Sequence, residues 1–434
     1  MRPAATTHVR RVMHLIGLLL VLLVAEGRGE QQQRIQEKLI GLQERIDNWL
    51  AAGGDPRAVL PLGQHLDALL DRGTPQEIEA QVDRIRAVIA TPPPTQPLTA
   101  PAATPVVVDV RPIPASAAII FYSVRSGIGP EIYTMDREGA EVTQITFLNP
   151  RPYDQPYEHV AASFDRKLIA ANRYLQGGSG PSGLWVIDLE HKTERRLVPD
   201  FFTAGDGGVD WSAEGFIYCA GRRTVRERSG LFRIRPDGSG LTQVLTLEAS
   251  DPGLVGDVSV AEDGSLLAFV RAVAAQVKSR TVLKTQIWIA RTDGSEPHMV
   301  DDGGPEVGNQ GGFPIGDFDP EISPDNKFVV FSRTNTQHVN FKDSFNTAHD
   351  LWVAPLDRST PARRLTAPGP ISVVPDWHDG KIVYTEYSEA TGYGGLVLIN
   401  PDGTGYRRLE PLQSLRDGGR HGKWIPDPSS KGPR

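Results

Sequence analysis

The feature that most constrains this chain is an internal repeat between residues 115 and 430. Each unit contains an apolar or aromatic segment, a turn such as Arg-Pro-Asp-Gly at 235–238, and a further strand-like segment. Asp-Gly between alternating apolar runs is a strong hairpin signal. Units of four predicted strands, spaced about 45–65 residues apart, are typical of propeller blades. The six apolar segments lie at 131–134, 184–187, 231–234, 287–290, 351–354 and 396–399.

The first unit lacks the opening strand of the other units, because it begins directly at 117–121. The missing element lies at the far end of the chain, where residues 424–427 have the Trp-x-x-acid spacing of residues 211–214. A strand from the C-terminal end would complete the first blade and leave no open sheet edge. We therefore predict an all-β fold, a six-bladed β-propeller closed by its C-terminal strand.

Residues 322–325 (Ile-Ser-Pro-Asp), 211–214 and 377–380 resemble the Trp-Ser-Pro-Asp-Gly repeats of TolB-like propellers. The resemblance covers residues 115–430 and implies a propeller that is commonly exported and commonly a protein-binding scaffold. It does not extend to TolB itself, because TolB has an N-terminal α/β domain where this chain has a helical segment. Propellers of prolyl oligopeptidase-type enzymes are also similar, but this chain lacks their Gly-x-Ser-x-Gly motif.

The N-terminal part of the chain predicts a targeting signal and a helical segment. The helical segment is either a small bundle packed on the main domain or a docking or dimerisation module. Arginines precede the apolar run 15–25, and small residues follow it, so residues 1–27 are typical of a signal peptide. The alternative is an uncleaved anchor, which would be the only link to a membrane. Residues 30–91 have helical periodicity, with an N-terminal cap at Thr74 and Glu77. Residues 92–114 are predicted to form a Pro-rich linker. The expected location is periplasmic or secreted.

Charge and cysteine content limit the classes of partner. The net charge of −7, without a basic stripe, argues against a nucleic-acid partner, and the expected partner is a protein of the cell envelope. A single cysteine, Cys219, excludes an internal disulfide framework and a cysteine-based zinc cluster. It lies in the apolar run 216–220, which favours a buried thiol over a nucleophile.

A candidate site follows from register. Three residues before the Trp or Ile position of each opening strand, four of six residues are His or Asp: His159, Asp257, Asp319 and His421. Innermost strands would bring them together at the channel mouth, where both residue types can bind a divalent metal. The alternative is a structural role, with these side chains capping strand starts. No cofactor is required, and a divalent metal at these four residues is the one candidate.

A second set of residues aligns at the ends of the second strands: Arg173, Arg271, Arg333 and Glu386. They predict either an anion-recognising rim or paired surface charge. Acidic turns such as Asp165 and Asp325 fall on the opposite face, where turn chemistry explains them.

Two functions remain open at this point. The first is an exported, non-catalytic scaffold that binds a protein or a ligand. The alternative is a metal-dependent lyase or hydrolase acting on an extracellular carbohydrate or lactone through the His/Asp site, and a weaker variant is a small-ligand or calcium sensor. The absence of a nucleophile motif favours a non-enzymatic role, without excluding an enzyme.

Overall fold

The computed structural model divides the chain into two compact units, residues 1–99 and 100–434. The predicted signal peptide, residues 1–27, and the first part of the predicted linker, residues 92–103, lie outside the described residues. No helix among the described residues is long and apolar enough to cross a membrane. The described residues are 42, 62, 65–66, 69, 74–90, 104–125, 130–147, 157–174, 182–198, 201–203, 208–222, 229–245, 255–277, 280–304, 315–335, 349–367, 369–388, 393–410, 413–414 and 418–426.

In the first unit, helix α5 (Pro75–Ala90) begins at the predicted cap. The Thr74 backbone N–H donates to Glu77 Oε2 at 2.8 Å, and the Glu77 N–H donates to Thr74 Oγ1 at 3.4 Å. These reciprocal bonds satisfy amide groups that the first turn leaves without helical partners. Val82 and Ile85 on the predicted apolar face are fully buried.

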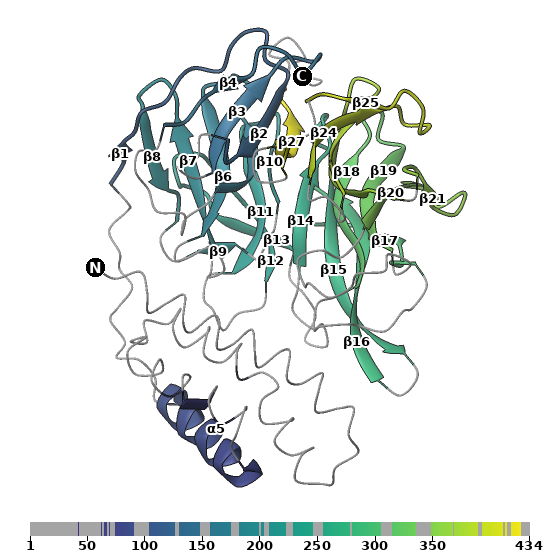
Figure 1. Cartoon of the computed structure of the whole chain (residues 1–434). Helices are drawn as coiled ribbons and strands as arrows, with labels where there is room; N and C mark the ends of the chain where they lie inside the picture. Colours follow the sequence, from purple (N-terminus) through teal and green to yellow (C-terminus); the bar gives the residue numbers. More distant parts are fainter. Residues whose placement is uncertain are drawn as a thin grey trace. The chain divides into compact units, whose positions relative to one another are not determined.

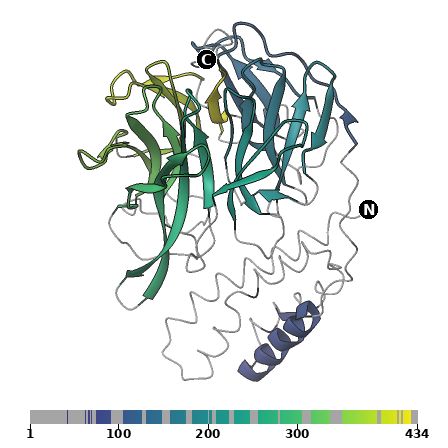
Figure 2. The same cartoon turned by 180° about the vertical axis from the view of Figure 1, so that it is seen from behind.

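The second unit is all-β, with a propeller-like arrangement of its sheets (Figures 1 and 2). Hydrogen bonding connects its strands into sheets of ten, eight, four and five strands. Inside the larger sheets, runs of four consecutive strands form antiparallel ladders, as the repeats predict. Two pairings join neighbouring ladders into the larger sheets. Strand β9 (Phe202–Thr203) pairs with one strand from each of two neighbouring ladders. Elsewhere, a parallel pair of strands joins two further ladders.

The ladders that follow the first sheet have these bounds: β5 (Tyr157–Ala162), β6 (Leu168–Tyr174), β7 (Ser182–Asp188) and β8 (Thr193–Arg196); β10 (Val209–Trp211), β11 (Ile217–Arg222), β12 (Gly230–Ile234) and β13 (Thr242–Leu245); β14 (Val255–Val260), β15 (Leu266–Val277), β16 (Arg280–Arg291) and β17 (His298–Asp301); β18 (Ile315–Ile322), β19 (Phe328–Thr334), β20 (His349–Pro355) and β21 (Arg363–Arg364); β22 (Ile371–His378), β23 (Lys381–Tyr387), β24 (Tyr393–Ile399) and β25 (Arg407–Arg408). The short strand β26 (Gln413–Ser414) pairs with β24, and the parallel pair is β16 with β18.

The first sheet joins the two ends of the repeat region. It consists of β2 (Ile119–Ser123), β3 (Glu131–Met135), β4 (Thr143–Gln144) and the C-terminal β27 (Arg420–Trp424). Strand β27 pairs antiparallel with β2, with Ile119 opposite Trp424. The pairing predicted from the Trp-x-x-acid spacing is therefore present, and β27 covers one edge of β2.

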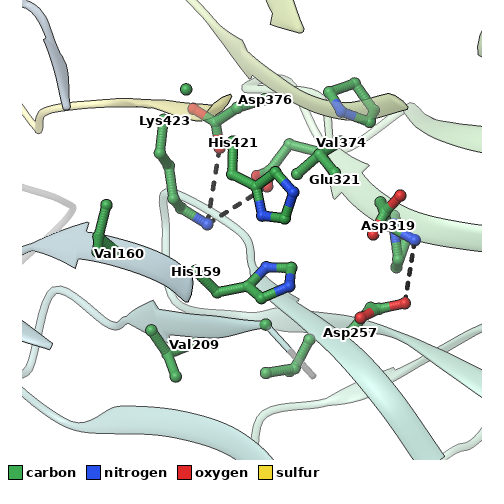
Figure 3. Close-up of a pocket in the computed structure, with 15 residues that line it drawn as sticks. His159, Val160, Val209, Asp257, Asp319, Glu321, Val374, Asp376, His421 and Lys423 are labelled. Carbon is green, nitrogen blue, oxygen red and sulfur yellow. Dashed lines mark hydrogen bonds and ion pairs between the residues drawn. The ribbon is translucent and has the colours of Figure 1, made fainter. Parts of the chain in front are cut away.

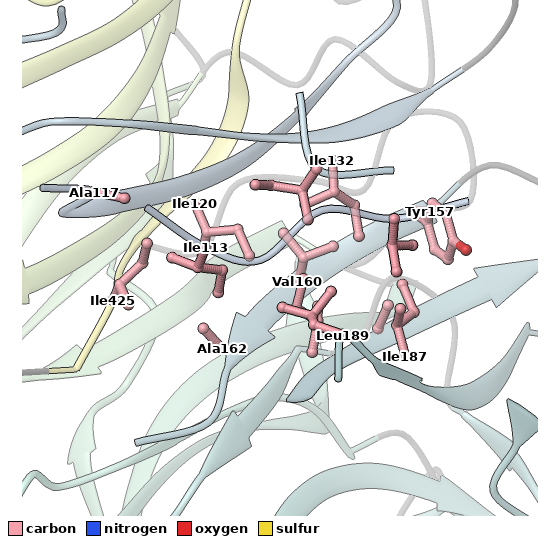
Figure 4. Packing of buried hydrophobic residues seen from close by; sticks show 14 of the residues in the cluster. Ile113, Ala117, Ile120, Ile132, Tyr157, Val160, Ala162, Ile187, Leu189 and Ile425 are labelled. Atoms are coloured by element: carbon pink, nitrogen blue, oxygen red, sulfur yellow. The ribbon is translucent and has the colours of Figure 1, made fainter. Parts of the chain in front are cut away.

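Apolar side chains fill the spaces between successive sheets, because alternate residues of each strand face opposite neighbours. Figure 4 shows Ile120 of the first sheet packed with Val160 and Ile187 of the next ladder. Phe121 of the first sheet packs with Leu396 of the last ladder, so the first and last sheets are also in contact. This packing places the innermost strands around a common channel.

The second half of the predicted linker is part of this unit. Strand β1 (Val106–Val107) pairs with β8, and Val110 forms a bridge with Thr146. Val110 and Ile113 are buried against the first sheet and the ladder β5–β8 (Figure 4). Residues 104–114 therefore lie along the sheets.

Candidate functional site

The residues aligned by register share an unusual backbone conformation. His159, Asp257, Asp319, Val374 and His421 all have left-handed φ values, between 39° and 51°. In each case the strand pairing shifts register at or beside the residue, which marks a β-bulge in the innermost strand. Bulges redirect a side chain and bend a strand, and they are common near binding sites.

This conformation is costly for most of these side chains. Left-handed backbone costs an L-residue roughly 1–2 kcal/mol, and a β-branched residue such as Val374 is a clear outlier there. The same strained geometry recurs in non-adjacent parts of the sequence. We conclude that the arrangement of the innermost strands imposes this left-handed backbone. Favourable packing of the sheets must offset its cost.

The redirected residues surround one small cavity, with a volume of about 50 Å³ (Figure 3). Each aligned position contributes the aligned residue and the residue after it. The contributing pairs are His159 and Val160, Gly208 and Val209, Asp257 and Val258, Asp319 and Pro320, Val374 and Pro375, and His421 and Gly422. The structure therefore brings together all four residues that the sequence selected, with the two aligned positions that carry no polar side chain.

Two of these residues form a histidine pair. The ring centroids of His159 and His421 lie 4.6 Å apart, with a 52° angle between the ring planes. Burial and the nearby His159 hold the pKa of His421 well below its usual value. His421 is therefore neutral at pH 7, and its backbone N–H donates to Thr385 Oγ1 at 2.9 Å.

The two aspartates have hydrogen-bonded positions on the same cavity wall. The Asp319 backbone N–H donates to Asp257 Oδ2 at 3.3 Å, and Ser332 Oγ donates to Asp319 Oδ2 at 2.9 Å. These bonds are typical of the capping role that the sequence left as an alternative. Among the described residues, no group of three or more His, Cys, Asp or Glu side chains is arranged to hold a metal ion.

A charged cluster that the sequence reasoning missed forms the floor of the cavity. Lys423 Nζ lies 3.1 Å from Asp210 Oδ1, 3.6 Å from Glu321 Oε2 and 3.6 Å from Asp376 Oδ1. Ser259 Oγ donates to Glu321 Oε1 at 2.9 Å. One ammonium group thus faces three carboxylates that are all nearly buried. Figure 3 shows Lys423 with two of them, Glu321 and Asp376.

The pKa values of two of these carboxylates are raised. Burial, opposed by Lys423 and reinforced by the neighbouring carboxylates, raises the pKa of Glu321 well above its usual value. Burial also raises the pKa of Asp376. The pKa of Lys423 is raised by the surrounding carboxylates, against the effect of burial, so the lysine stays charged.

A sequence signal for this cluster did exist. Its members occupy the position directly before the Trp or Ile of the opening strands, two residues after the bulge position. Read down that column, the residues are Ala161, Asp210, Ser259, Glu321, Asp376 and Lys423. Four charged residues in strands that the repeat requires to be innermost predict a buried electrostatic network.

A second cavity adjoins the cluster on the side of the acidic turns. Its volume is about 280 Å³, and it is lined by Asp210 and by three residues that also line the first cavity, Glu321, Asp376 and Lys423. Its other walls are largely aromatic, formed by Phe164, Trp211, Trp377 and Trp424, with Val260, Glu262, Asp263, Pro324, His378 and Pro426. The charged cluster therefore separates two cavities within the channel.

The residues predicted as a rim are engaged with side chains of their own ladders, and Arg333 also binds Asp301 of the preceding ladder. Arg173 is 1 % exposed, lies 4.8 Å above the Trp185 ring and binds Glu194 at 3.1 Å. Arg333 lies 4.6 Å above Trp352 and donates to Asp317 Oδ1 at 2.7 Å.

The remaining two rim positions follow the same pattern. Arg271 lies 4.5 Å above Trp288, and Glu386 accepts a bond from Arg408 at 2.6 Å. None of the four predicted rim residues lines either channel cavity. The anion-recognising rim and the paired surface charge both stay predictions.

Comparison with known proteins supports the fold. No protein-family model matches the chain, and no curated protein matches it. TolB from Acinetobacter baumannii aligns with a TM-score of 0.51 and 13% identity, over 73% of this chain and 68% of that chain. Kuenenia stuttgartiensis hydrazine synthase aligns with a TM-score of 0.50 and 13% identity, over 73% of this chain but only 47% of that chain.

TolB from Agrobacterium tumefaciens aligns with a TM-score of 0.41 and 12% identity, over 72% of this chain and 99% of that chain. At these identities the likeness shows the fold alone. The predicted resemblance to TolB-like propellers is confirmed at that level.

Proposed function

We propose that this chain is an exported, non-catalytic propeller of six blades that acts as a protein- or ligand-binding scaffold in the cell envelope. The TolB-like fold supports the proposal, as does the pairing of β27 with β2. The predicted signal peptide supports export, and the predicted helical module supplies a second surface for partners. In this proposal the propeller is a rigid scaffold, and partners bind to the loops at the two ends of its channel.

The observation that carries the non-catalytic role is the size of the His/Asp cavity. Sites for organic ligands typically enclose roughly 300–1,000 Å³, whereas the cavity around His159, Asp257, Asp319 and His421 encloses about 50 Å³. That volume is comparable to one or two water molecules. A sugar ring or lactone does not fit between these four residues.

The alternative remains a metal-dependent lyase or hydrolase that acts through the same residues. The close approach of His159 and His421 favours it, because imidazoles are common metal ligands. The aspartates, however, accept bonds from a backbone amide and a serine hydroxyl. Because the described residues form no metal-holding group, we derive no metal-dependent step.

Elemental analysis of the purified full chain separates the two functions. A scaffold is expected to hold no stoichiometric divalent metal, and His159→Ala is expected to leave the metal content unchanged. The same samples are assayed for cleavage of polyuronates and lactones. Stoichiometric metal that is lost in His159→Ala, together with turnover, would establish the enzyme.

Photo-crosslinking in the native host tests the scaffold directly. A photoreactive residue replaces Asp379, an exposed turn residue beside the larger cavity, and a control replaces Val107, which is 82 % exposed on strand β1. We expect a discrete crosslinked species from position 379 and none from position 107. N-terminal sequencing of the same protein tests removal of residues 1–27. Absence of a crosslink at position 379 would contradict the scaffold role. Protein that stays in the cytoplasm with residues 1–27 attached would contradict export.

A further inference from the structure

The larger channel cavity has properties that the proposed scaffold role does not use. It lies on the side of the acidic turns and encloses about 280 Å³, close to the lower limit for small-ligand sites. Trp211, Trp377 and Trp424 are each less than a tenth exposed, so packing holds their rings in place. The cavity thus offers rigid aromatic walls of the kind that bind small ligands.

The charge on the lining is strongly one-sided. Carboxyl groups outnumber basic groups by five to two, since Lys423 and His378 face Asp210, Glu262, Asp263, Glu321 and Asp376. Burial raises the pKa of two of the five, Glu321 and Asp376, and the other three still outnumber the two basic groups. His378 Nδ1 lies 2.6 Å from Glu262 Oε1, and that carboxylate raises the pKa of His378. Even with His378 protonated, the cavity keeps an excess of negative charge. It therefore attracts cations and repels anionic sugars and phosphates.

The hydrogen-bonding capacity of the carboxylates is already largely engaged by the protein. Asp210 Oδ2 accepts the Val260 N–H at 2.8 Å, and Asp376 Oδ2 accepts the Trp424 N–H at 2.6 Å. Their negative field remains, but few lone pairs are left for new donors. A cation that needs no hydrogen bonds suits this cavity better than a primary ammonium does, and aromatic faces recognise such cations.

Trp424 differs from the equivalent Trp211 in the environment of its indole N–H. Trp424 lines the cavity and is 6 % exposed, and its indole N–H has no acceptor among the residues that the structure describes. The equivalent Trp211 N–H, by contrast, donates to the Ala161 carbonyl at 3.0 Å. A buried indole donor without an acceptor is costly. Because the nitrogen itself is buried, a ligand in the cavity meets the ring of Trp424 and not its N–H.

We propose that this cavity binds a small methylated ammonium compound, with the ammonium against the tryptophan faces. The inference rests on the proposed function only in treating the propeller as a binding module. It names a ligand class for the face of the acidic turns, away from His159 and Asp257.

Isothermal titration of the full chain with choline tests the proposal. We expect saturable binding with a Kd of ~1 mM or tighter, and at least tenfold weaker binding of 3,3-dimethyl-1-butanol, the uncharged isostere of choline. Ethanolamine, which has a primary ammonium, is expected to bind several-fold more weakly than choline. Equal binding of choline and its uncharged isostere, or no choline binding, would overturn the inference.

Variants locate the site. Trp424→Phe replaces the indole by the smaller phenyl ring, which attracts cations more weakly, and we expect about fivefold weaker binding. Glu262→Gln removes one lining charge and should weaken binding about three- to tenfold. Glu190→Gln, which changes an exposed carboxylate elsewhere, is the matched control and should bind as the parent does. Unchanged affinity in both cavity variants would place any choline site elsewhere. A partner crosslinked at position 379 without choline binding would leave the proposed function standing and this inference wrong.

Discussion

Lys423 Nζ lies 3.1 Å from Asp210 Oδ1, so a lysine of the closing strand β27 meets an aspartate of β10 inside the channel. The same ammonium group faces Glu321 and Asp376 from two further innermost strands. Because these strands are distant in sequence, the contact forms only when the innermost strands surround the channel. The lysine therefore links closure of the sheets to neutralisation of buried charge.

Replacing this lysine should strongly destabilise the protein. Lys423→Met retains much of the apolar stem but leaves three nearly buried carboxylates without their cation, which is expected to cost about 3–5 kcal/mol. Urea unfolding of the second unit measures the change. Lys167→Met, which removes the exposed pair with Glu190, is the control and should show no measurable change. Equal effects of the two substitutions would contradict a structural role for the cluster.

Glu321 makes stability depend on pH in a defined direction. Its folded-state pKa is raised above 4.5, so the native state binds more protons than the unfolded chain between the two values. Stability from this group is present below about pH 4.5 and is lost as the pH rises through the folded pKa. Asp210, Asp376 and Lys423 face the same group.

Glu321→Gln should therefore gain stability relative to the parent as the pH rises, by at most about 1.4 kcal/mol per pH unit. Denaturation curves of both proteins between about pH 4 and pH 8 measure the difference. A difference that stays constant, or that shrinks with rising pH, would show that Glu321 is ionised in the folded protein at all these pH values.

The strained bulge position at Val374 predicts an unusual response to glycine. Val374→Gly relieves left-handed strain at φ 51°, whereas Val373→Gly places glycine in ordinary strand backbone opposite Thr385. Both valines are half-buried, so the loss of packing is similar. We expect Val374→Gly to be more stable than Val373→Gly by about 1–2 kcal/mol. Thermal unfolding of the pair measures this, and the reverse order would disprove the strain.

The thiol of Cys219 should be unreactive towards alkylating reagents in the folded protein. It is fully buried, and burial raises the pKa of its thiol to about 12. Alkylation by iodoacetamide near pH 8 is therefore expected only after unfolding in guanidinium chloride, because the thiolate is the reactive species. Mass spectrometry of native and unfolded samples measures it. Rapid native alkylation would mean that the β11 core opens locally.

Comparison of equivalent positions in the aligned repeats predicted part of the site. The bulge column selected His159, Asp257, Asp319 and His421, and the structure places all four around one cavity. It could not show that bulges turn these side chains inward, because a bulge is a property of strand pairing. The charged cluster with Asp210 and Lys423 occupies the aligned positions two residues further along each strand. These charges lie in strands expected to be innermost, so the sequence could also have predicted this cluster.

The linker shows how a compositional signal can hide a structural one. Prolines in 92–114 indicate an extended chain, but the β-branched run 106–108 within it is also a strand signal. Whether such a run pairs depends on an available edge, which β8 offers. Local sequence does not contain that information.

By itself the sequence determined the repeat, the β class, the capped helix at Pro75 and the pairing of the Trp424 strand with the first sheet, because each depends on local propensity or on a spacing that recurs along the chain. Only the tertiary structure decided which side chains meet. The volume between His159 and Asp319, and the carboxylates gathered around Lys423, arise from strands that are far apart in sequence. Their distances depend on the closing geometry of the sheets, which no single repeat encodes.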